Sequence, residues 1–261
     1  MRANAVRTTM AAGRPVVNAW ISSAGPYAAE TLSYAGFDSV TVDVQHGMFG
    51  RGAVVGLLQA ISAGPAMPMV RPSSLDAGQI GWLLDAGAYG IICPSVDTPR
   101  DAEALVAACR YPPRGSRSFG PSRGLLYGGS DYVARSDEIL VWAMVESAAS
   151  LAHLDEIVST EGIDGVYVGP NDLALSMGET PGGRIRGRVR DALCHIVERA
   201  HVHGRFVGVF CVDGAEASDC VEIGCDLVTP GNDISMLKHE ASRRIAAIRG
   251  GRESTSPTSG Y

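Results

Sequence analysis

The sequence is poor in positive charge and in aromatic side chains. Its 28 acidic residues outnumber its 22 lysines and arginines, which gives a formal net charge of -6 at pH 7. Because proteins that bind phosphate backbones or anionic bilayers present basic surfaces, this balance argues against nucleic acid or a membrane as the main partner. Only 6% of the residues are aromatic, whereas 32 are glycines. We therefore expect an aliphatic core and many tight turns.

Segments typical of membrane or secreted proteins are missing as well. No window approaches 18 consecutive apolar residues, so we expect no transmembrane helix. Residues 1–17 include basic side chains but lack the apolar stretch of a secretory signal. The six cysteines show no CxxC pair and no zinc-finger spacing, and most lie in apolar runs. These features favour reduced core cysteines and a cytoplasmic location.

Short apolar runs alternate with helix-like segments along the chain. The expected strands are residues 15–21, 39–44, 67–71, 90–94, 139–146, 165–169, 206–211 and 227–231. The expected helices are residues 26–36, 51–62, 75–87, 99–110, 147–160, 188–204, 213–224 and 233–249. Such alternation indicates an α/β protein built from parallel βαβ units. Eight units in one chain of this length favour a (β/α)8 or TIM barrel over an open sheet.

We expect a single barrel domain over residues 1–250, since no linker divides the chain. Residues 251–261 are polar and are expected to be disordered. Residues 110–136 are rich in Gly, Pro, Ser and Arg without an apolar period, which predicts a long structureless loop that is functional or mobile.

Polar side chains stand where several of the expected strands end. Asp43 and His46 end the second strand, Arg71 the third and Glu146 the fifth, and Asp172 follows the sixth. Active-site residues of TIM barrels lie at the carboxyl ends of the strands. An acid, a base and a cation therefore converge from four strands on one rim.

Glu146 and Asp172 are the candidate metal ligands. Two carboxylates, with water and substrate oxygens completing the shell, suit Mg²⁺ or Mn²⁺. Each carboxylate also has a structural alternative. Glu146 could interact with the amino end of the following helix, and Asp172 could be a helix N-cap. Their placement after successive strands favours the metal site.

Arg71 and His46 are the candidates for anion binding and proton transfer. Arg71 precedes Pro72, which fixes the backbone, so its guanidinium could hold a carboxylate or a developing enolate oxygen. A surface ion pair is the alternative. Asp43 could hold one ring nitrogen of His46 and leave the other free for a proton. A purely structural histidine is the alternative there.

Six stretches together carry a family resemblance: "FDSVTVDVQHGMFG", "MPMVRPS", "LLDAGAYGIICPSVDT", "CRYPPRGSRS", "MVESAASLAHLDEIVSTEGIDGVYVGPNDLALSMG" and "GCDLVTPGND". In this order they resemble the HpcH/HpaI class II pyruvate aldolase family over residues 13–248. The most specific part is "GVYVGPNDL" with its upstream glutamate. The resemblance implies a modified TIM barrel whose last helix is swapped between subunits, in a homohexamer built as a trimer of dimers.

The resemblance also implies an activity, namely reversible retro-aldol cleavage of a 4-hydroxy-2-oxo acid into pyruvate and an aldehyde, with Mg²⁺, Mn²⁺ or Co²⁺. Glu146 and Asp172 would bind the metal, Arg71 the 2-oxo group, and His46 with Asp43 would transfer protons. Asp85 would reach a neighbouring subunit's site, and a charged residue on a helix surface is the alternative there. By weaker motif matches, Gly169, Pro170 and Asn171 beside the metal, and Ser122 and Arg123 in the long loop, would shape the substrate site.

Two positions depart from the family pattern. Gln45 stands where relatives often have glutamate, and Met144 where they often have glutamine. Both changes would alter the pocket near the metal and bear on the identity of the substrate. The chain's one lysine, Lys238, lies on the last expected helix, and the implied mechanism needs no Schiff base.

Other functions on the same scaffold stay open at this point. A citramalyl- or malyl-CoA-type lyase would share the metal and the enolate but would need a groove for CoA. A non-catalytic protein that binds a metal and an oxo acid is also compatible with the two departures. A nucleotide cofactor is not expected, because the glycine-rich residues 47–52 and 181–187 match neither the P-loop nor the dinucleotide fingerprint.

Overall fold

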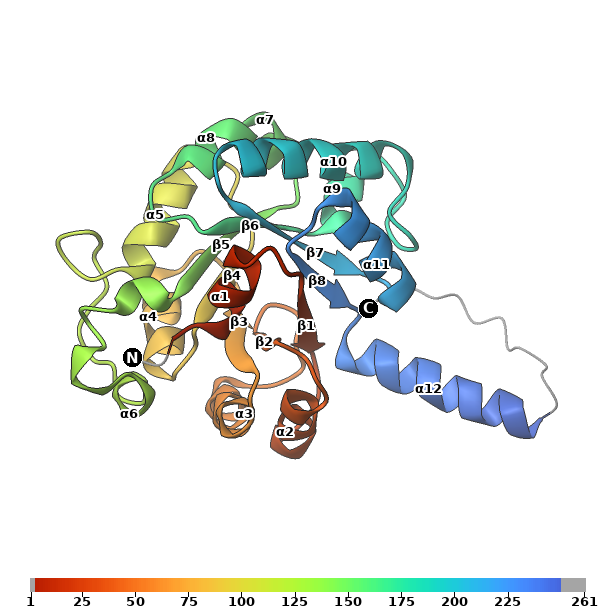
Figure 1. Ribbon diagram of the computed structural model, residues 1–261, viewed down its shortest axis with the longest axis horizontal. Coiled ribbons are helices and arrows are strands. Elements are labelled where there is room, and N and C mark those ends of the chain that lie inside the picture. Colours follow the sequence, from red (N-terminus) through yellow and green to blue (C-terminus); the bar gives the residue numbers. More distant parts are fainter. Residues whose placement is uncertain (1–2, 250–261) are drawn as a thin grey trace.

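The computed structural model describes residues 3–249 and shows a closed barrel of eight parallel strands (Figure 1). Each strand pairs with the next in sequence, and β1 pairs with β8. The strands are β1 (Val16–Ile21), β2 (Ser39–Asp43), β3 (Met67–Arg71), β4 (Gly90–Cys93), β5 (Leu140–Val145), β6 (Gly165–Val168), β7 (Phe206–Cys211) and β8 (Leu227–Pro230). All eight lie within the predicted ranges, so the predicted (β/α)8 barrel is confirmed.

Helices surround the barrel. The long ones are α2 (Pro26–Tyr34), α3 (Arg51–Ala63), α4 (Ala77–Asp85), α5 (Pro99–Cys109), α10 (Gly187–Val202), α11 (Gly214–Ile223) and α12 (Asp233–Ile248). The shorter elements are α1 (Ala5–Ala11), α6 (Gly124–Gly128), η1 (Gly129–Asp131), η2 (Ser136–Glu138), α7 (Ala148–Ala152), α8 (Leu154–Ser159) and α9 (Pro170–Ser176). The single helix predicted over residues 147–160 is wrong in detail, because His153 separates α7 from α8.

The strands are buried on both faces, as parallel strands covered by helices must be. Nearly all of their residues are buried, and Val17, Phe206 and Pro230 are the exceptions. Three aspartates recur immediately before β2, β6 and β8. Each accepts a backbone hydrogen bond from the preceding strand: Asp38 from Val17, Asp164 from Val141 and Asp226 from Val207. These bonds fix the amino ends of neighbouring strands, away from the functional rim.

Helix α1, which the sequence pattern did not predict, lies against the amino end of the barrel. Val6 and Met10 are buried there. The Asn4 side chain donates to the carbonyl oxygens of Tyr89 at 3.0 Å and Glu138 at 2.8 Å. The Asn4 side chain therefore links the residues that precede β4 and β5.

Residues 110–136 are ordered, and the prediction of a structureless loop is wrong for them. They include α6 and η1, and Arg110, Arg117 and Tyr132 are buried. Arg110 donates to the carbonyl oxygen of Ile139 at 3.1 Å. Arg117 pairs with Asp85 at 2.7 Å. Buried arginines thus attach the segment to the barrel where apolar periodicity is missing.

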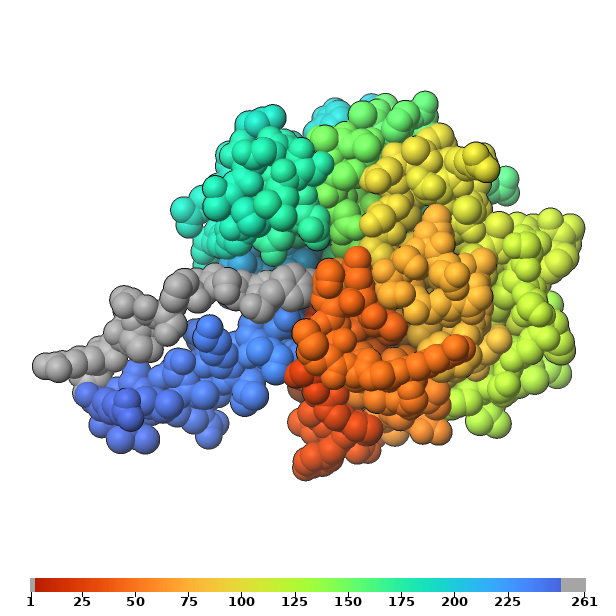
Figure 2. All heavy atoms as spheres, turned by 180° about the vertical axis from the view of Figure 1, so that it is seen from behind, coloured from red at the N-terminus to blue at the C-terminus, as the bar shows by residue number. Residues whose placement is uncertain are grey.

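Helix α12 extends away from the barrel in both views (Figure 1, Figure 2). None of its residues is buried, and Leu237 and Ile248 are 67% and 86% exposed. Its first residue, Asp233, accepts backbone hydrogen bonds from Ser22 at 2.8 Å, Ser23 at 3.0 Å and Ala24 at 2.6 Å. The helix is therefore anchored at its amino end only. The tail predicted to be disordered, residues 251–261, lies outside the described residues.

Within residues 3–249, none of the helices combines the length and the apolar character needed to cross a bilayer.

Candidate active site

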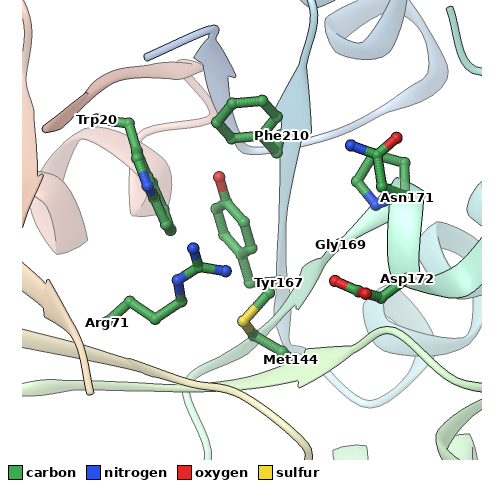
Figure 3. Close-up of a pocket in the computed structure, with 9 residues that line it drawn as sticks. Trp20, Arg71, Met144, Tyr167, Gly169, Asn171, Asp172 and Phe210 are labelled. Carbon is green, nitrogen blue, oxygen red and sulfur yellow. The ribbon is translucent and has the colours of Figure 1, made fainter. Parts of the chain in front are cut away.

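A pocket opens at the carboxyl ends of the strands. Its lining residues are Trp20, Arg71, Met144, Tyr167, Gly169, Pro170, Asn171, Asp172 and Phe210. Figure 3 shows the Arg71 guanidinium between Trp20 and Met144, with Asn171 and Asp172 on the opposite side. A cation and a carboxylate therefore face one another across a largely apolar pocket.

Arg71 forms a buried ion pair with Asp43. In the sheet register the two residues stand directly opposite, at the ends of β3 and β2. Arg71 Nε donates to Asp43 Oδ1 at 2.9 Å, and an Nη donates to Oδ2 at 2.5 Å. Asp43 is fully buried and Arg71 is 3% exposed. Two parallel charge-assisted bonds fix the plane of the guanidinium, which a single contact would not do.

The Asp43 carboxylate accepts three further hydrogen bonds. They come from Trp20 Nε1 at 3.2 Å, Gln45 N at 3.0 Å and His46 N at 3.1 Å. Burial by itself would raise the pKa of Asp43, but the bonds from Arg71 and its charge outweigh burial, so the pKa is lowered. Asp43 is therefore an anion that holds its neighbours in place.

This arrangement corrects one prediction. Asp43 contacts His46 through the backbone N–H of His46 and not through the imidazole ring. Five donors already share the two carboxylate oxygens, which leaves little capacity for a sixth. Asp43 thus orients Arg71 and the backbone of residues 45–46. The His46 side chain is exposed at the mouth of the barrel.

Glu146 directly follows β5 and is 8% exposed. Its Oε1 accepts the backbone N–H of Ser95 at 2.7 Å. Burial raises the pKa of Glu146, and the nearby Asp172 carboxylate raises it further, against the opposing hydrogen bond from Ser95. Glu146 and Asp172 are thus close enough for their charges to repel.

Neither of these two carboxylates caps a helix. The N-cap of α7 is Ser147, which forms a capping box with Ser150, so Glu146 does not cap that helix. The N-cap of α9 is Gly169, and Asp172 lies in the first turn without a capping hydrogen bond. Both carboxylates remain available for another partner.

The donor set fits a hard divalent cation. Glu146 Oε2 has no hydrogen-bond donor among residues 3–249, although the side chain is largely buried, and a second carboxylate lies nearby. Oxygen ligands of this kind suit Mg²⁺ or Mn²⁺. The described residues contain no cluster of three or more His, Cys, Asp or Glu arranged for a metal. Two protein carboxylates would therefore be joined by water and substrate oxygens.

Gly169 makes room for this carboxylate. A Cβ at this position would lie 2.9 Å from Glu146 Oε2 and 3.2 Å from Met144 Cε. The first distance is shorter than real Cβ contacts and the second is tight, so a side chain at position 169 would require the ends of the Glu146 and Met144 side chains to move. Beside it, Pro170 and Asn171 line the pocket, and Asn171 Oδ1 accepts the N–H of Gly182 at 2.8 Å.

Asp85, Ser122 and Arg123 lie away from this pocket, in a group of their own. Asp85 ends α4 and pairs with the buried Arg117. Arg123 donates its backbone N–H to the Asp85 carbonyl at 3.0 Å and a side-chain N–H to the Ala86 carbonyl at 2.6 Å. Ser122 is exposed beside it. The structure thus groups Asp85, Ser122 and Arg123 with one another and not with the pocket of their own chain.

Sequence reasoning missed the apolar wall of the site, which Trp20, Tyr167 and Phe210 form. The Trp20 and Tyr167 rings stack with centroids 5.6 Å apart, and Phe210 meets Trp20 edge-on at 5.8 Å. A signal for them existed, because aromatics are scarce in this chain and these three lie on predicted strands. Ser95 was missed because a backbone N–H leaves no mark in the sequence.

Comparison of the sequence with known proteins identifies the family of this chain. The family model described as "HpcH/HpaI aldolase/citrate lyase" matches residues 17–240. The chain belongs to this family. It is 44% identical to a hydroxypyruvate/pyruvate aldolase of Rhizorhabdus wittichii, over 94% of this chain and 99% of that protein. It is 34% identical to a 4-hydroxy-2-oxo-heptane-1,7-dioate aldolase of Salmonella dublin, over 98% of each chain.

Among solved structures, a HpcH/HpaI aldolase/citrate lyase family protein from Burkholderia cenocepacia superimposes with a TM-score of 0.87 at 30% identity. The match covers 95% of this chain and all of that one. Since the curated relatives over nearly the full length are aldolases, this member of the family is a carbon-carbon lyase of the aldehyde-lyase class.

Proposed function

We propose that this member is a divalent-metal-dependent class II aldolase, which cleaves a 4-hydroxy-2-oxo acid reversibly into pyruvate and an aldehyde. The observation that carries the proposal is a pocket in which Arg71, held in place by Asp43, faces Asp172, with Glu146 packed against Gly169. Positive charge on one side and metal ligands on the other can together stabilise the negative charge of an enolate.

Glu146 and Asp172 would hold the cation, which we propose to be Mg²⁺, Mn²⁺ or Co²⁺. The bound cation would supply Lewis-acid stabilisation of the negative charge that develops on the substrate oxygens. Because the protein offers two carboxylates, the 2-oxo acid itself can complete the shell.

Arg71 would bind the 2-oxo acid and stabilise the enolate oxygen. Its Nε and one Nη are engaged by Asp43, so the guanidinium is oriented before the substrate arrives. Donors that are already in place need no reorganisation while charge develops on the enolate. Gly169, Pro170 and Asn171 would bound the substrate on the metal side.

His46 would transfer the protons, through water. In the cleavage direction the 4-hydroxyl loses its proton, the C3–C4 bond breaks to give the aldehyde, and C3 of the enolate gains a proton to give pyruvate. An imidazole can accept the first proton and return one. Asp43 supports this step by holding the backbone N–H of His46.

We propose that the active assembly is a homohexamer in which α12 packs on a neighbouring subunit. The observation that supports this is an exposed apolar row on α12, formed by Ile234, Leu237, Ile245 and Ile248. We further propose that Asp85, with Ser122 and Arg123 beside it, faces the pocket of a neighbouring subunit. The Asp85 carboxylate keeps 25% exposure, although Arg117 holds one of its oxygens.

A cytoplasmic location is also part of the proposal. All six cysteines lie in the described part of the chain and are free thiols, five of them buried. Reduced thiols in this number are typical of a reducing compartment.

The test is pyruvate release from 4-hydroxy-2-oxo acids by protein that has been treated with EDTA and then given Mg²⁺, Mn²⁺ or Co²⁺. We expect activity only with added metal, and none with Glu146→Ala. Activity that survives both complete chelation and Glu146→Ala would contradict the metal mechanism. Hydroxypyruvate is offered in the synthesis direction as a second donor, because a relative's name includes it.

Two further measurements distinguish the alternatives. Turnover of citramalyl- or malyl-CoA without turnover of free oxo acids would identify a CoA-ester lyase. Metal binding without deuterium exchange at the methyl group of pyruvate would identify a non-catalytic binding protein.

A further inference from the structure

Trp20 contacts both members of the Asp43–Arg71 ion pair. Its indole Nε1 donates to Asp43 Oδ2 at 3.2 Å, and the Arg71 guanidinium carbon lies 4.9 Å from the centroid of its ring. One side chain therefore supplies a hydrogen bond to the anion and an aromatic surface to the cation. Trp20 itself is 1% exposed, so neither contact competes with bulk water.

The Trp20 indole N–H donates to Asp43 Oδ2, the oxygen that also accepts the shorter of the two hydrogen bonds from Arg71. Asp43 Oδ2 accepts from an Arg71 Nη and from Trp20 Nε1, whereas Oδ1 accepts from Arg71 Nε and from the backbone. Without the indole donor, Oδ2 would be held by Arg71 alone. The carboxylate plane could then rotate, and the guanidinium would follow it.

Trp20 is fixed from the opposite side. Its ring stacks on Tyr167 with an interplanar angle of 27° and meets Phe210 at 84°. The Tyr167 hydroxyl donates to Thr229 Oγ1 at 2.8 Å, and Asn18 Nδ2 donates to the same oxygen at 3.0 Å. Hydrogen bonds inside the barrel therefore hold Tyr167 in place, and Tyr167 in turn packs against Trp20.

We propose that Trp20 is a positioning residue for Arg71, acting through the indole N–H bond to Asp43 and through the ring face. The inference rests on the proposed function, in which Arg71 binds the 2-oxo acid. Trp20 sets the direction in which the guanidinium points, and it also forms part of the pocket wall.

The test compares Trp20→Phe with Trp142→Phe, and kcat and KM for the 2-oxo acid are measured in each. Trp142 is a suitable control because it is also fully buried, on β5, and its Nε1 has no partner among the described residues. Loss of one hydrogen bond to a charged group changes a rate or binding constant by about 10-fold or more. We expect Trp20→Phe to lower kcat/KM by about that factor and Trp142→Phe to have little effect.

A double-mutant cycle separates positioning from general packing. If Trp20 acts through Arg71, the effect of Trp20→Phe should largely vanish in an Arg71→Lys background, which has no planar fork to orient. Equal effects of the two tryptophan substitutions, or full additivity of Trp20→Phe with Arg71→Lys, would overturn the proposal. If Trp20→Phe does not fold, Trp20→Tyr takes its place in the cycle.

Calorimetry measures the binding of pyruvate to the metal-loaded protein in the same variants. This measurement tests the role of Trp20 without requiring turnover. If wild type binds pyruvate but cleaves no oxo acid, the proposed function fails, and the cycle in binding affinity still decides the role of Trp20. Pyruvate affinity that Trp20→Phe leaves unchanged would count against the role.

Discussion

Ser95 donates its backbone N–H to Glu146 from a left-handed backbone conformation, with φ at 56°. It is the one residue other than glycine with positive φ in the described part of the chain. This conformation costs a side-chain-bearing residue about 1 kcal/mol or more. This hydrogen bond holds Oε1 of Glu146, the proposed metal ligand, while Oε2 lies on the side of Gly169.

We expect Ser95→Val to lower the free energy of unfolding by about 1–2 kcal/mol, because a β-branched side chain tolerates positive φ poorly. It should also weaken Mn²⁺ binding, since Glu146 loses its support. Ser95→Gly keeps the N–H and relieves the strain, so it should unfold no more easily than wild type. Denaturant unfolding and Mn²⁺ titration check both variants. A Val variant with wild-type stability would contradict the account.

The raised pKa of Glu146 predicts how stability depends on pH in metal-free protein. The unfolded chain ionises Glu146 near its ordinary value of 4.5, whereas the folded protein holds the proton to higher pH. Stability from this group is therefore full below the unfolded pKa and is lost as pH rises through the folded pKa.

We expect Glu146→Gln to be more stable than wild type above that range in EDTA, and to show a flatter dependence on pH. Urea unfolding in EDTA at a series of pH values, from about 4 to 8, measures the difference between the two proteins. Added Mg²⁺ should stabilise wild type at neutral pH and leave Glu146→Gln unchanged. Identical curves for the two proteins in EDTA would show that ionised Glu146 is not strained.

The Asp43–Arg71 pair predicts a large loss of stability when one partner is removed alone. Asp43→Asn leaves a buried guanidinium without its counter-charge, which typically destabilises by about 3–5 kcal/mol. The double variant Asp43→Asn/Arg71→Met removes both charges and should recover a substantial part of that loss, although it is expected to be inactive. Thermal and denaturant unfolding of the three proteins test this. A single variant as stable as wild type would mean that the pair contributes little.

Subunit complementation tests the proposed role of Asp85. Asp85→Asn and Glu146→Ala are each expected to be inactive as homo-oligomers. When they are co-expressed, an Asp85→Asn subunit can receive Asp85 from a Glu146→Ala neighbour, and random assembly gives intact composite sites in about one quarter of cases. Pyruvate release by the mixed assembly measures this. A mixture as inactive as its parents would place Asp85 outside the site of a neighbour.

The barrel could be predicted because its signal is local. Most strands are short apolar runs bounded by polar residues, glycine or proline, so eight strands and most of the long helices follow from the order of residues. Helices α1 and α9 escaped prediction because they are each seven residues long and depend on neighbours for their burial. The sequence does not show those neighbours.

The sequence names candidate site residues but does not show which of them pair. Asp43 and His46 are three positions apart, which favoured a dyad between them. The sheet register instead places Asp43 opposite Arg71, 28 positions along the chain. Arg117 and Asp85 illustrate the same point, because their contact at 2.7 Å spans 32 positions. At Gln45, where relatives often have glutamate, the side-chain Oε1 is buried and has no hydrogen-bond donor among the described residues.

The anchor of α12 also links the periphery of the molecule to the mouth of the barrel. Asp233 holds the backbone of residues 22–24, and the carbonyl of Ser22 accepts the N–H of Met48 at 2.7 Å, two residues beyond His46. Apart from the Asp233 carboxylate, every group in this connection belongs to the main chain. The last helix and the loop that carries His46 are therefore connected through the backbone of residues 22–24, and that connection depends on one carboxylate.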